Sequence, residues 1–266
     1  MDEKPLVINS LIKGDQVHGY YVEALPRPGV LWKILDVFRK YNVNVLSINF
    51  SPTPSPEKPG LIFIVAEAKG LKDVEERLMK DVEEVEEVVS IEREEAKPLG
   101  LLIDQYHFPI VNGLGLRCLL TDEKAYEASL KLVKEHLGSP GLALLYHEGR
   151  AIGLGYARLL KELGVEDLKD LVTICLAYAK SHGAFKGELI EYNFNPATNK
   201  GRLVLRIYDL WECETAKRSG VREPSSHKTR GMIAGLIEGF VGKRASVKED
   251  KCIAKGDKYC QFTVEI

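Results

Sequence analysis

The chain has 266 residues, with 37 Lys and Arg against 39 Asp and Glu, so its formal net charge is −2. This balance gives no general attraction to nucleic acid or to an anionic membrane, and the length suffices for two ordinary domains. The most apolar run, residues 171–179, is far shorter than the roughly 20 residues that span a bilayer. We therefore expect small-molecule and protein partners, and neither nucleic acid nor membrane.

The beginning of the chain, MDEKP, lacks the basic region and the long apolar core of an export signal, so we expect a cytoplasmic protein. The five cysteines are an odd number without a regular spacing, which favours a reducing compartment over a disulfide framework. A composition rich in Lys and Glu, with only three Gln, indicates a thermophilic source.

The first ninety-odd residues predict a ferredoxin-like βαββαβ sandwich. Residues 30–41 place Leu31, Ile34, Leu35 and Phe38 on one helical face, and a loop with four prolines at 51–60 cannot be regular structure. The expected order is strand 20–25, helix 30–41, strand 43–50, strand 61–66, helix 71–79 and strand 85–91.

The segment RPGVL at 27–31, followed by a strand that begins NVNV at 42–45, resembles an ACT domain over residues 17–95. The resemblance implies sheet-to-sheet pairing of two copies and an effector site at Pro28, Gly29, Val30 and Leu31. Gly29 allows a ligand to approach the backbone, and the N–H groups that open the helix attract a carboxylate. The alternative is that Pro28 and Gly29 only make a tight turn.

A charged segment that ends at Pro98 predicts the domain boundaries: an extension at 1–16, the first domain at 17–95 and a second domain at 98–266. The second domain is predicted to be α+β, with helices packed on an antiparallel sheet. Its expected elements are a strand-like opening 99–108, helices 123–137, 151–163 and 165–182, strands 187–194 and 202–211, and a final helix and hairpin. Gly231, Gly235 and Gly239 recur every four residues in the final helix and predict close helix packing.

The final hairpin carries a candidate metal site. Glu249 and Cys252 are three residues apart, and Cys260 follows eight residues later across a turn at Gly256. Zinc accepts thiolate, imidazole and carboxylate in a tetrahedral shell, which His227 or Ser226 would complete. The alternatives are two buried apolar cysteines beside a solvated Glu, or a disulfide.

The segments WECE at 211–214, SHKTRG at 226–231, Gly235 and the Glu249, Cys252, Cys260 pattern together resemble the 4-vinyl reductase domain family over residues 98–266. The resemblance implies a dimer that binds a small apolar, aromatic or tetrapyrrole-like ligand, with structural zinc on the Glu and the Cys pair. The family's remaining zinc-ligand cysteine falls at Ser226, so His227 or Cys213 would have to take its place.

Aromatic and imidazole side chains near the element ends are candidates for lining an apolar ligand pocket. They are His147, Tyr156, Tyr178, His182 and Trp211. The alternative for each is an ordinary core or rim residue.

These features favour a small-molecule sensor, a homodimer whose downstream protein partner the sequence does not name. Gly242-Lys243 and Gly153-Leu154-Gly155 fail the phosphate-loop and dinucleotide spacings, and no catalytic residues stand out. The alternatives are an enzyme or accessory protein of tetrapyrrole or aromatic metabolism, and a non-catalytic assembly adaptor.

Overall fold

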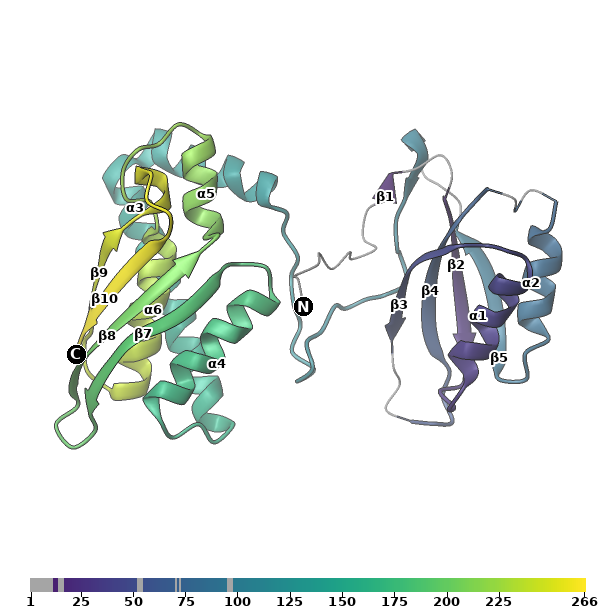
Figure 1. Cartoon of the computed structure of the whole chain (residues 1–266), viewed down its shortest axis with the longest axis horizontal. Helices are drawn as coiled ribbons and strands as arrows, with labels where there is room; N and C mark the ends of the chain where they lie inside the picture. Colours follow the sequence, from purple (N-terminus) through teal and green to yellow (C-terminus); the bar gives the residue numbers. More distant parts are fainter. Residues whose placement is uncertain (1–11, 14–16, 52–54, 70, 72, 95–97) are drawn as a thin grey trace. The chain divides into compact units, whose positions relative to one another are not determined.

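The computed structural model describes residues 12–13, 17–51, 55–69, 71, 73–94 and 98–266. Contacts divide the chain into two compact units, Met1–Leu119 and Leu120–Ile266, each with its own core (Figure 1).

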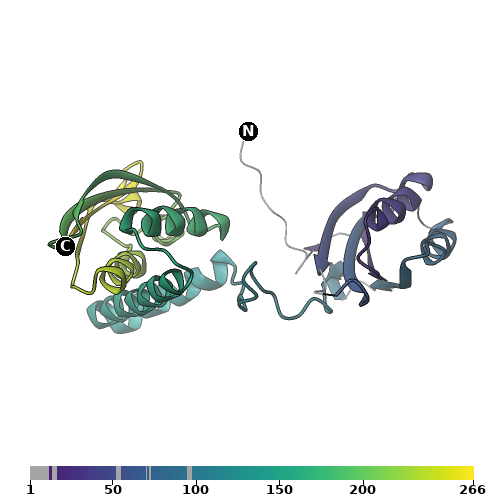
Figure 2. The ribbon, with the colours of Figure 1, turned by 90° about the horizontal axis from the view of Figure 1, so that it is seen from below.

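The first unit is an antiparallel sheet of four strands in the order β3-β4-β2-β5, with two helices on one face (Figure 2). Its elements are β2 (Val17–Ala24), α1 (Val30–Lys40), β3 (Val45–Ser51), β4 (Gly60–Glu67), α2 (Glu75–Glu83) and β5 (Val88–Glu94). This arrangement confirms the predicted βαββαβ order.

Helix α1 packs on the sheet through Val30, Ile34, Val37 and Phe38. Leu31, which we expected on the buried face, is 39% exposed. Val30 and Val37 are seven residues apart, about two turns of the helix, so they lie on the same side of it. This side contacts the core, and the Leu31 side is turned away from it.

The other face of this sheet is also partly covered. A short strand β6 (Leu101–Leu102), which follows a 3₁₀ turn η1 (Pro98–Gly100), pairs with β1 (Ile12–Lys13). Leu102 packs with Tyr21, Phe63 and Val65 in a small second core. The segment after residue 98, which we expected to open the second domain, thus contacts the first unit.

The second unit has an antiparallel sheet in the order β7-β8-β10-β9. Its elements are α3 (Glu123–Glu162), α4 (Leu168–Ser181), β7 (Lys186–Asn195), β8 (Lys200–Tyr208), α5 (Trp211–Arg218), α6 (His227–Val241), β9 (Ser246–Lys251), the 3₁₀ turn η2 (Ile253–Lys255) and β10 (Cys260–Glu265). Helices α4 and α6 pack their apolar sides on the sheet to form the main core (Figure 2). The α+β class is confirmed.

Two local expectations differ from the structure. The predicted helix stop at 138–141 is a kink inside α3, where Gly138 adopts φ 53 and ψ −134 and the helix then resumes. Pro140 fits there because its missing N–H falls in the first turn of the resumed segment. The predicted strand 202–211 ends at Tyr208, and Trp211 instead begins the short helix α5.

Helices α3 and α6 touch backbone to backbone through glycines. A Cβ atom on Gly153 would lie 2.1 Å from Met232 O, and one on Gly235 would lie 2.0 Å from Arg150 O. The predicted close packing at the glycines of the final helix is confirmed, and it fixes α6 against α3.

Candidate metal centre and ligand cavity

Four metal-binding side chains meet beneath the final hairpin. Cys213 from α5, Glu249 from β9, Cys252 and Cys260 each offer one donor atom, and these atoms all lie within 4.8 Å of one another. The Cys213 and Cys252 sulfurs are 3.5 Å apart, and Cys213 Sγ lies 3.9 Å from Glu249 Oε1. We call these four residues the donor cluster.

The local chain path explains why the hairpin donors converge. After Cys252 the chain makes the single 3₁₀ turn η2, and Gly256 closes it at φ 107, a conformation that favours glycine. Asp257 Oδ2 accepts a hydrogen bond from Cys252 N at 2.8 Å, and Ile253 N donates to Cys260 Sγ at 3.4 Å. These contacts turn both sulfurs toward the same point.

The donor cluster has the chemistry of a metal site. All three cysteines are fully buried, and burial raises the pKa of Glu249 to about 8. Hydrogen bonds from Cys213 and Cys260 lower the pKa of Cys252 below that of an ordinary thiol. Three sulfurs and one carboxylate oxygen are a donor set that zinc accepts in tetrahedral sites. A divalent cation would compensate the charge that this buried group of acids acquires on ionisation, so the cluster can hold a metal.

The sequence left the fourth metal ligand open between Ser226, His227 and Cys213. Of these three, Cys213 is the one that lies in the donor cluster. Ser226 is buried directly before α6. His227 lies outside the donor cluster, in a groove that it lines with Tyr146, His147 and Arg230. Burial, together with the positive charge of Arg230, lowers the pKa of His227.

Glu212, which the sequence analysis did not single out, connects the donor cluster to α6. Its carboxylate is buried and accepts hydrogen bonds from Lys228 N at 2.9 Å and from Thr229 N and Oγ1 at 3.0 Å each. Burial raises the pKa of Glu212, and these hydrogen bonds oppose the rise. Glu212 therefore caps the first turn of α6 from α5, next to Cys213.

A separate apolar cavity lies between α4, α6 and the sheet. Its volume is 170 Å³, and Val172, Leu205, Ile233 and other aliphatic side chains line most of it. Such a cavity favours an apolar ligand with few polar groups.

Tyr156, Tyr178 and His182 supply the polar edge of the cavity. The Tyr178 and His182 rings are 4.0 Å apart, and the Tyr156 and Tyr178 rings are 5.6 Å apart. His182 Nδ1 lies 2.9 Å from Tyr178 O, so this nitrogen donates its proton to the carbonyl. In the neutral ring, Nε2 is then an acceptor.

The other two predicted pocket residues lie elsewhere. Trp211 packs edge-on against Tyr126 and lines a second hollow. His182 and Ala184 line both this hollow and the cavity. His147 lines the groove with His227. The structure thus gathers three of the five candidates around one cavity.

The predicted effector loop of the first unit has the backbone that the sequence suggests. Gly29 adopts φ 87 directly before α1, and Pro28 and Gly29 are exposed, whereas the Val30 side chain is buried. Glu87, which sequence reasoning missed, lies beside this helix start, where Lys33 Nζ contacts its Oε1 at 2.6 Å. Among the described residues, its Oε2 atom is buried without a hydrogen-bond partner.

Comparison with known families agrees with these two architectures. The model of the ACT domain matches residues 24–83, and the model of the 4-vinyl reductase domain matches residues 203–266. The chain carries an ACT domain followed by a 4-vinyl reductase domain. Both resemblances drawn from the sequence are confirmed. Together these domains support a small-molecule-binding regulatory or sensor role.

Individual relatives cover parts of the chain. The uncharacterized protein MJ1642 of Methanocaldococcus jannaschii is 26% identical over 134 residues, which are 50% of this chain and 70% of the relative. MJ0855 of the same organism is 31% identical over 136 residues, half of each protein. The chain thus spans only half the length of that relative.

Among solved structures, the phenol-responsive sensory domain of the transcription activator PoxR matches with a TM-score of 0.53 at 21% identity. The match covers 56% of this chain and 77% of that domain. This likeness concerns the fold. In the part of the chain that the structure describes, the helices are too short or too polar to cross a membrane.

Proposed function

We propose that this protein is a sensor whose 4-vinyl reductase domain binds a one-ring aromatic molecule in the cavity between α4 and α6. The observation that carries the proposal is the aliphatic cavity with one imidazole acceptor at its edge. The ACT domain would bind a second, polar effector, and the two units together would form a regulatory protein.

Cavity size narrows the ligand class. An engineered cavity of about 150 Å³ lined by aliphatic side chains binds benzene, so 170 Å³ accommodates one ring with a small substituent. A tetrapyrrole is several times larger. Of the ligand classes that the sequence suggested, this volume favours a monocyclic aromatic or a short hydrocarbon.

The polar edge favours a ligand with a single hydroxyl group. Because His182 Nδ1 faces Tyr178 O, Nε2 of the neutral ring is the nitrogen left to accept a hydrogen bond, and His182 lines the cavity. The PoxR sensory domain, whose structure contains phenol, adopts the same fold. Phenol is therefore the first probe, and toluene is the matched molecule without the hydroxyl.

Thermal unfolding of the full chain with increasing phenol tests this proposal. A ligand at 100 times its Kd stabilises the folded protein by about 2.7 kcal/mol. Ala179→Phe fills the cavity and should abolish the phenol-dependent shift, whereas Ala177→Phe, on the exposed side of the same helix, should retain it. An equal shift in both variants, or none in the parent with phenol, toluene or longer alkanes, would refute the cavity as a binding site.

We further propose that the donor cluster holds structural zinc. Cys213, Glu249, Cys252 and Cys260 would provide four protein ligands, which leaves no open position for a substrate. Bound zinc would keep the hairpin and α5 together and supply no chemistry to the cavity.

For the ACT domain, the proposed effector is a free amino acid. Its carboxylate would meet the N–H groups at the start of α1, and its ammonium group would pair with the second carboxylate oxygen of Glu87. Isothermal titration with the twenty amino acids tests this, with Glu87→Gln as the variant expected to lose binding. The homodimer, the cytoplasmic location and the domain limits stay predictions.

A further inference from the structure

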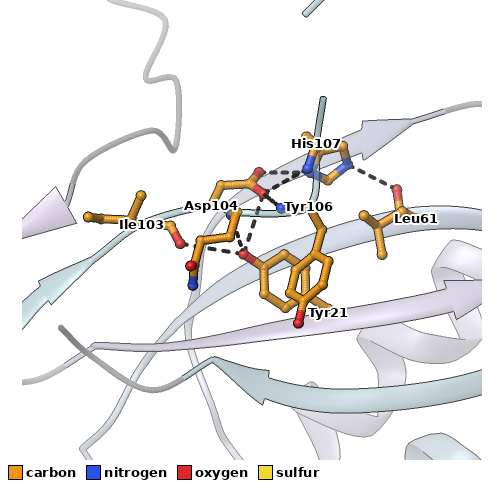
Figure 3. Close-up of polar contacts among 7 residues, drawn as sticks. Tyr21, Leu61, Ile103, Asp104, Tyr106 and His107 are labelled. Carbon is orange, nitrogen blue, oxygen red and sulfur yellow. Dashed lines mark hydrogen bonds and ion pairs between the residues drawn. The ribbon is translucent and has the colours of Figure 1, made fainter. Parts of the chain in front are cut away.

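Residues 101–108, here called the strap, lie on the face of the ACT sheet that is opposite α1 and α2. The strap begins with β6 and runs past Tyr21 of β2 to Leu61 at the beginning of β4 (Figure 3). Leu102 is buried there against Tyr21 and Phe63. The rest of the strap is half-buried or exposed, so polar contacts have to hold it.

Tyr21 provides the first anchor. Its hydroxyl accepts a hydrogen bond from Gln105 N at 2.8 Å, and its ring stacks on Phe63 with 4.5 Å between the centroids. Tyr106 packs edge-on against the same ring, again at 4.5 Å. This anchor has no charge at neutral pH, because burial raises the pKa of Tyr21 further above its ordinary value.

His107 provides the second anchor, and both of its ring nitrogens face acceptors. Nδ1 lies 2.7 Å from Asp104 Oδ2, and Nε2 lies 3.3 Å from the carbonyl oxygen of Leu61 on β4 (Figure 3). A neutral imidazole carries one N–H and can satisfy only one of them. The doubly protonated ring satisfies both.

The groups around His107 also favour the imidazolium. Asp104 is 7% exposed and is held by the N–H groups of Tyr106 and His107. Among the described residues, the other titratable groups that contact the strap or belong to it include Tyr106, Tyr21 on β2 and Glu94 on β5, whose Oε1 accepts from Gln105 Nε2 at 2.6 Å. From β4 the contact is a backbone carbonyl.

We propose that the strap is a proton-dependent clasp: the His107 imidazolium fastens residues 101–108 to the ACT sheet, and loss of its proton loosens them. The loosened strap would expose the apolar face formed by Tyr21 and Phe63.

The sign of the pH dependence follows from the pairing. The hydrogen bond to Asp104 raises the pKa of His107 above its ordinary value of 6.5. Burial opposes ionisation of Asp104, yet the bond from His107 lowers its pKa below the ordinary value. The fastening is complete below pH of about 6.5 and is lost as the pH rises through the higher pKa of folded His107.

Release would also change the chain that connects the two domains. Eight residues, 101–108, would pass from the ACT sheet to the connector, and an extended chain of that length reaches about 26 Å. The protonation of one side chain would therefore set the freedom of the second domain relative to the ACT domain.

Hydrogen exchange of the full chain at pH 6 and pH 8, corrected for the intrinsic exchange rate, tests the clasp. We expect peptides that cover 101–108 to be better protected at pH 6 than at pH 8, because deprotonation of His107 removes one of its two hydrogen bonds. His107→Gln should show the low protection at both pH values, while His136→Gln, at an exposed position of α3, should behave as the parent does.

A ring titration supplies the second measurement. NMR should give His107 a pKa above 6.5, and Asp104→Asn should lower it, without unfolding the ACT core. Equal protection of the strap at pH 6 and pH 8 in the parent protein, or a His107 titration that Asp104→Asn leaves unchanged, would overturn the proposal.

Discussion

Cys213 is the side chain that completes the donor cluster, since the hairpin alone offers three ligands. We expect Cys213→Ser to lose bound zinc, because an uncharged hydroxyl replaces a thiolate ligand. Elemental analysis with native mass spectrometry reports the metal per chain. Cys175→Ser, which removes a thiol that lines the cavity, is the matched control and should keep the metal. Zinc that survives Cys213→Ser but not His227→Ala would instead assign the fourth position to His227.

Glu212 is a buried carboxylate whose partners are the first N–H groups of α6. Glu212→Ala should lower the free energy of unfolding by about 1–3 kcal/mol, because it leaves buried donors unsatisfied. Urea unfolding measures the change. Glu214→Ala, on the less buried side of the same helix, should lower the free energy of unfolding far less. Equal decreases in the two variants would mean that the cap does not stabilise α6.

His182 separates hydroxylated from plain aromatic ligands in the proposed cavity. His182→Phe keeps the ring but removes the Nε2 acceptor, so phenol should lose its advantage over toluene. Calorimetric titration of both ligands into both proteins gives the comparison. A preference for phenol that persists in the variant would place the hydroxyl elsewhere.

Among the secondary-structure elements, the crossing of α3 and α6 depends on specific glycines. A Cβ on Gly153 would collide with Met232 O, whereas one on Gly155, two residues along the same helix, would meet nothing within 4 Å. Gly153→Ala should therefore destabilise the second unit strongly. Gly155→Ala should stabilise it by about 0.5–1 kcal/mol, because alanine loses less backbone entropy in a helix. Chemical unfolding measures the stability of both variants. If the glycines mattered only through backbone entropy, both substitutions would change the free energy of unfolding in the same direction.

The ACT fold was predictable because its first helix and its strands have a clear apolar pattern, and Pro or Gly marks several of the boundaries, at 26–29, 52–60 and 70. Helix α5 was not, since it has eight residues, four of them charged, directly after a strand. The kink in α3 was taken for a stop because Gly138 and Pro140 are typical of helix ends, and only packing against α6 shows that the helix resumes.

The candidate site was also predictable from the sequence only in part. Glu249, Cys252 and Cys260 share one hairpin, so their spacing indicates their proximity. Cys213 is 36 residues from Glu249, and its approach depends on how α5 packs, which no local pattern encodes. Tyr178 and His182 lie one helical turn apart and were foreseeable neighbours, whereas the contact of His107 with the Leu61 carbonyl joins residues 46 positions apart.

For the whole molecule, two separate cores predict two unfolding events. Thermal unfolding of the full chain should resolve one transition for each unit, because each core is buried within its own unit. Removing zinc with a chelator should lower the transition of residues 120–266 and leave the ACT transition in place. A single transition that shifts as a whole would instead show that the two units unfold cooperatively.

The backbone contact between α3 and α6 also limits which ligands related chains can come to bind. Helix α6 forms one wall of the cavity and has no space behind it into which it could retreat. Helix α4 forms the opposite wall through Val172, Cys175 and Ala179, without such a glycine crossing. Substitutions on α4 should therefore be the route by which this scaffold comes to accommodate bulkier molecules, while α6 stays unchanged.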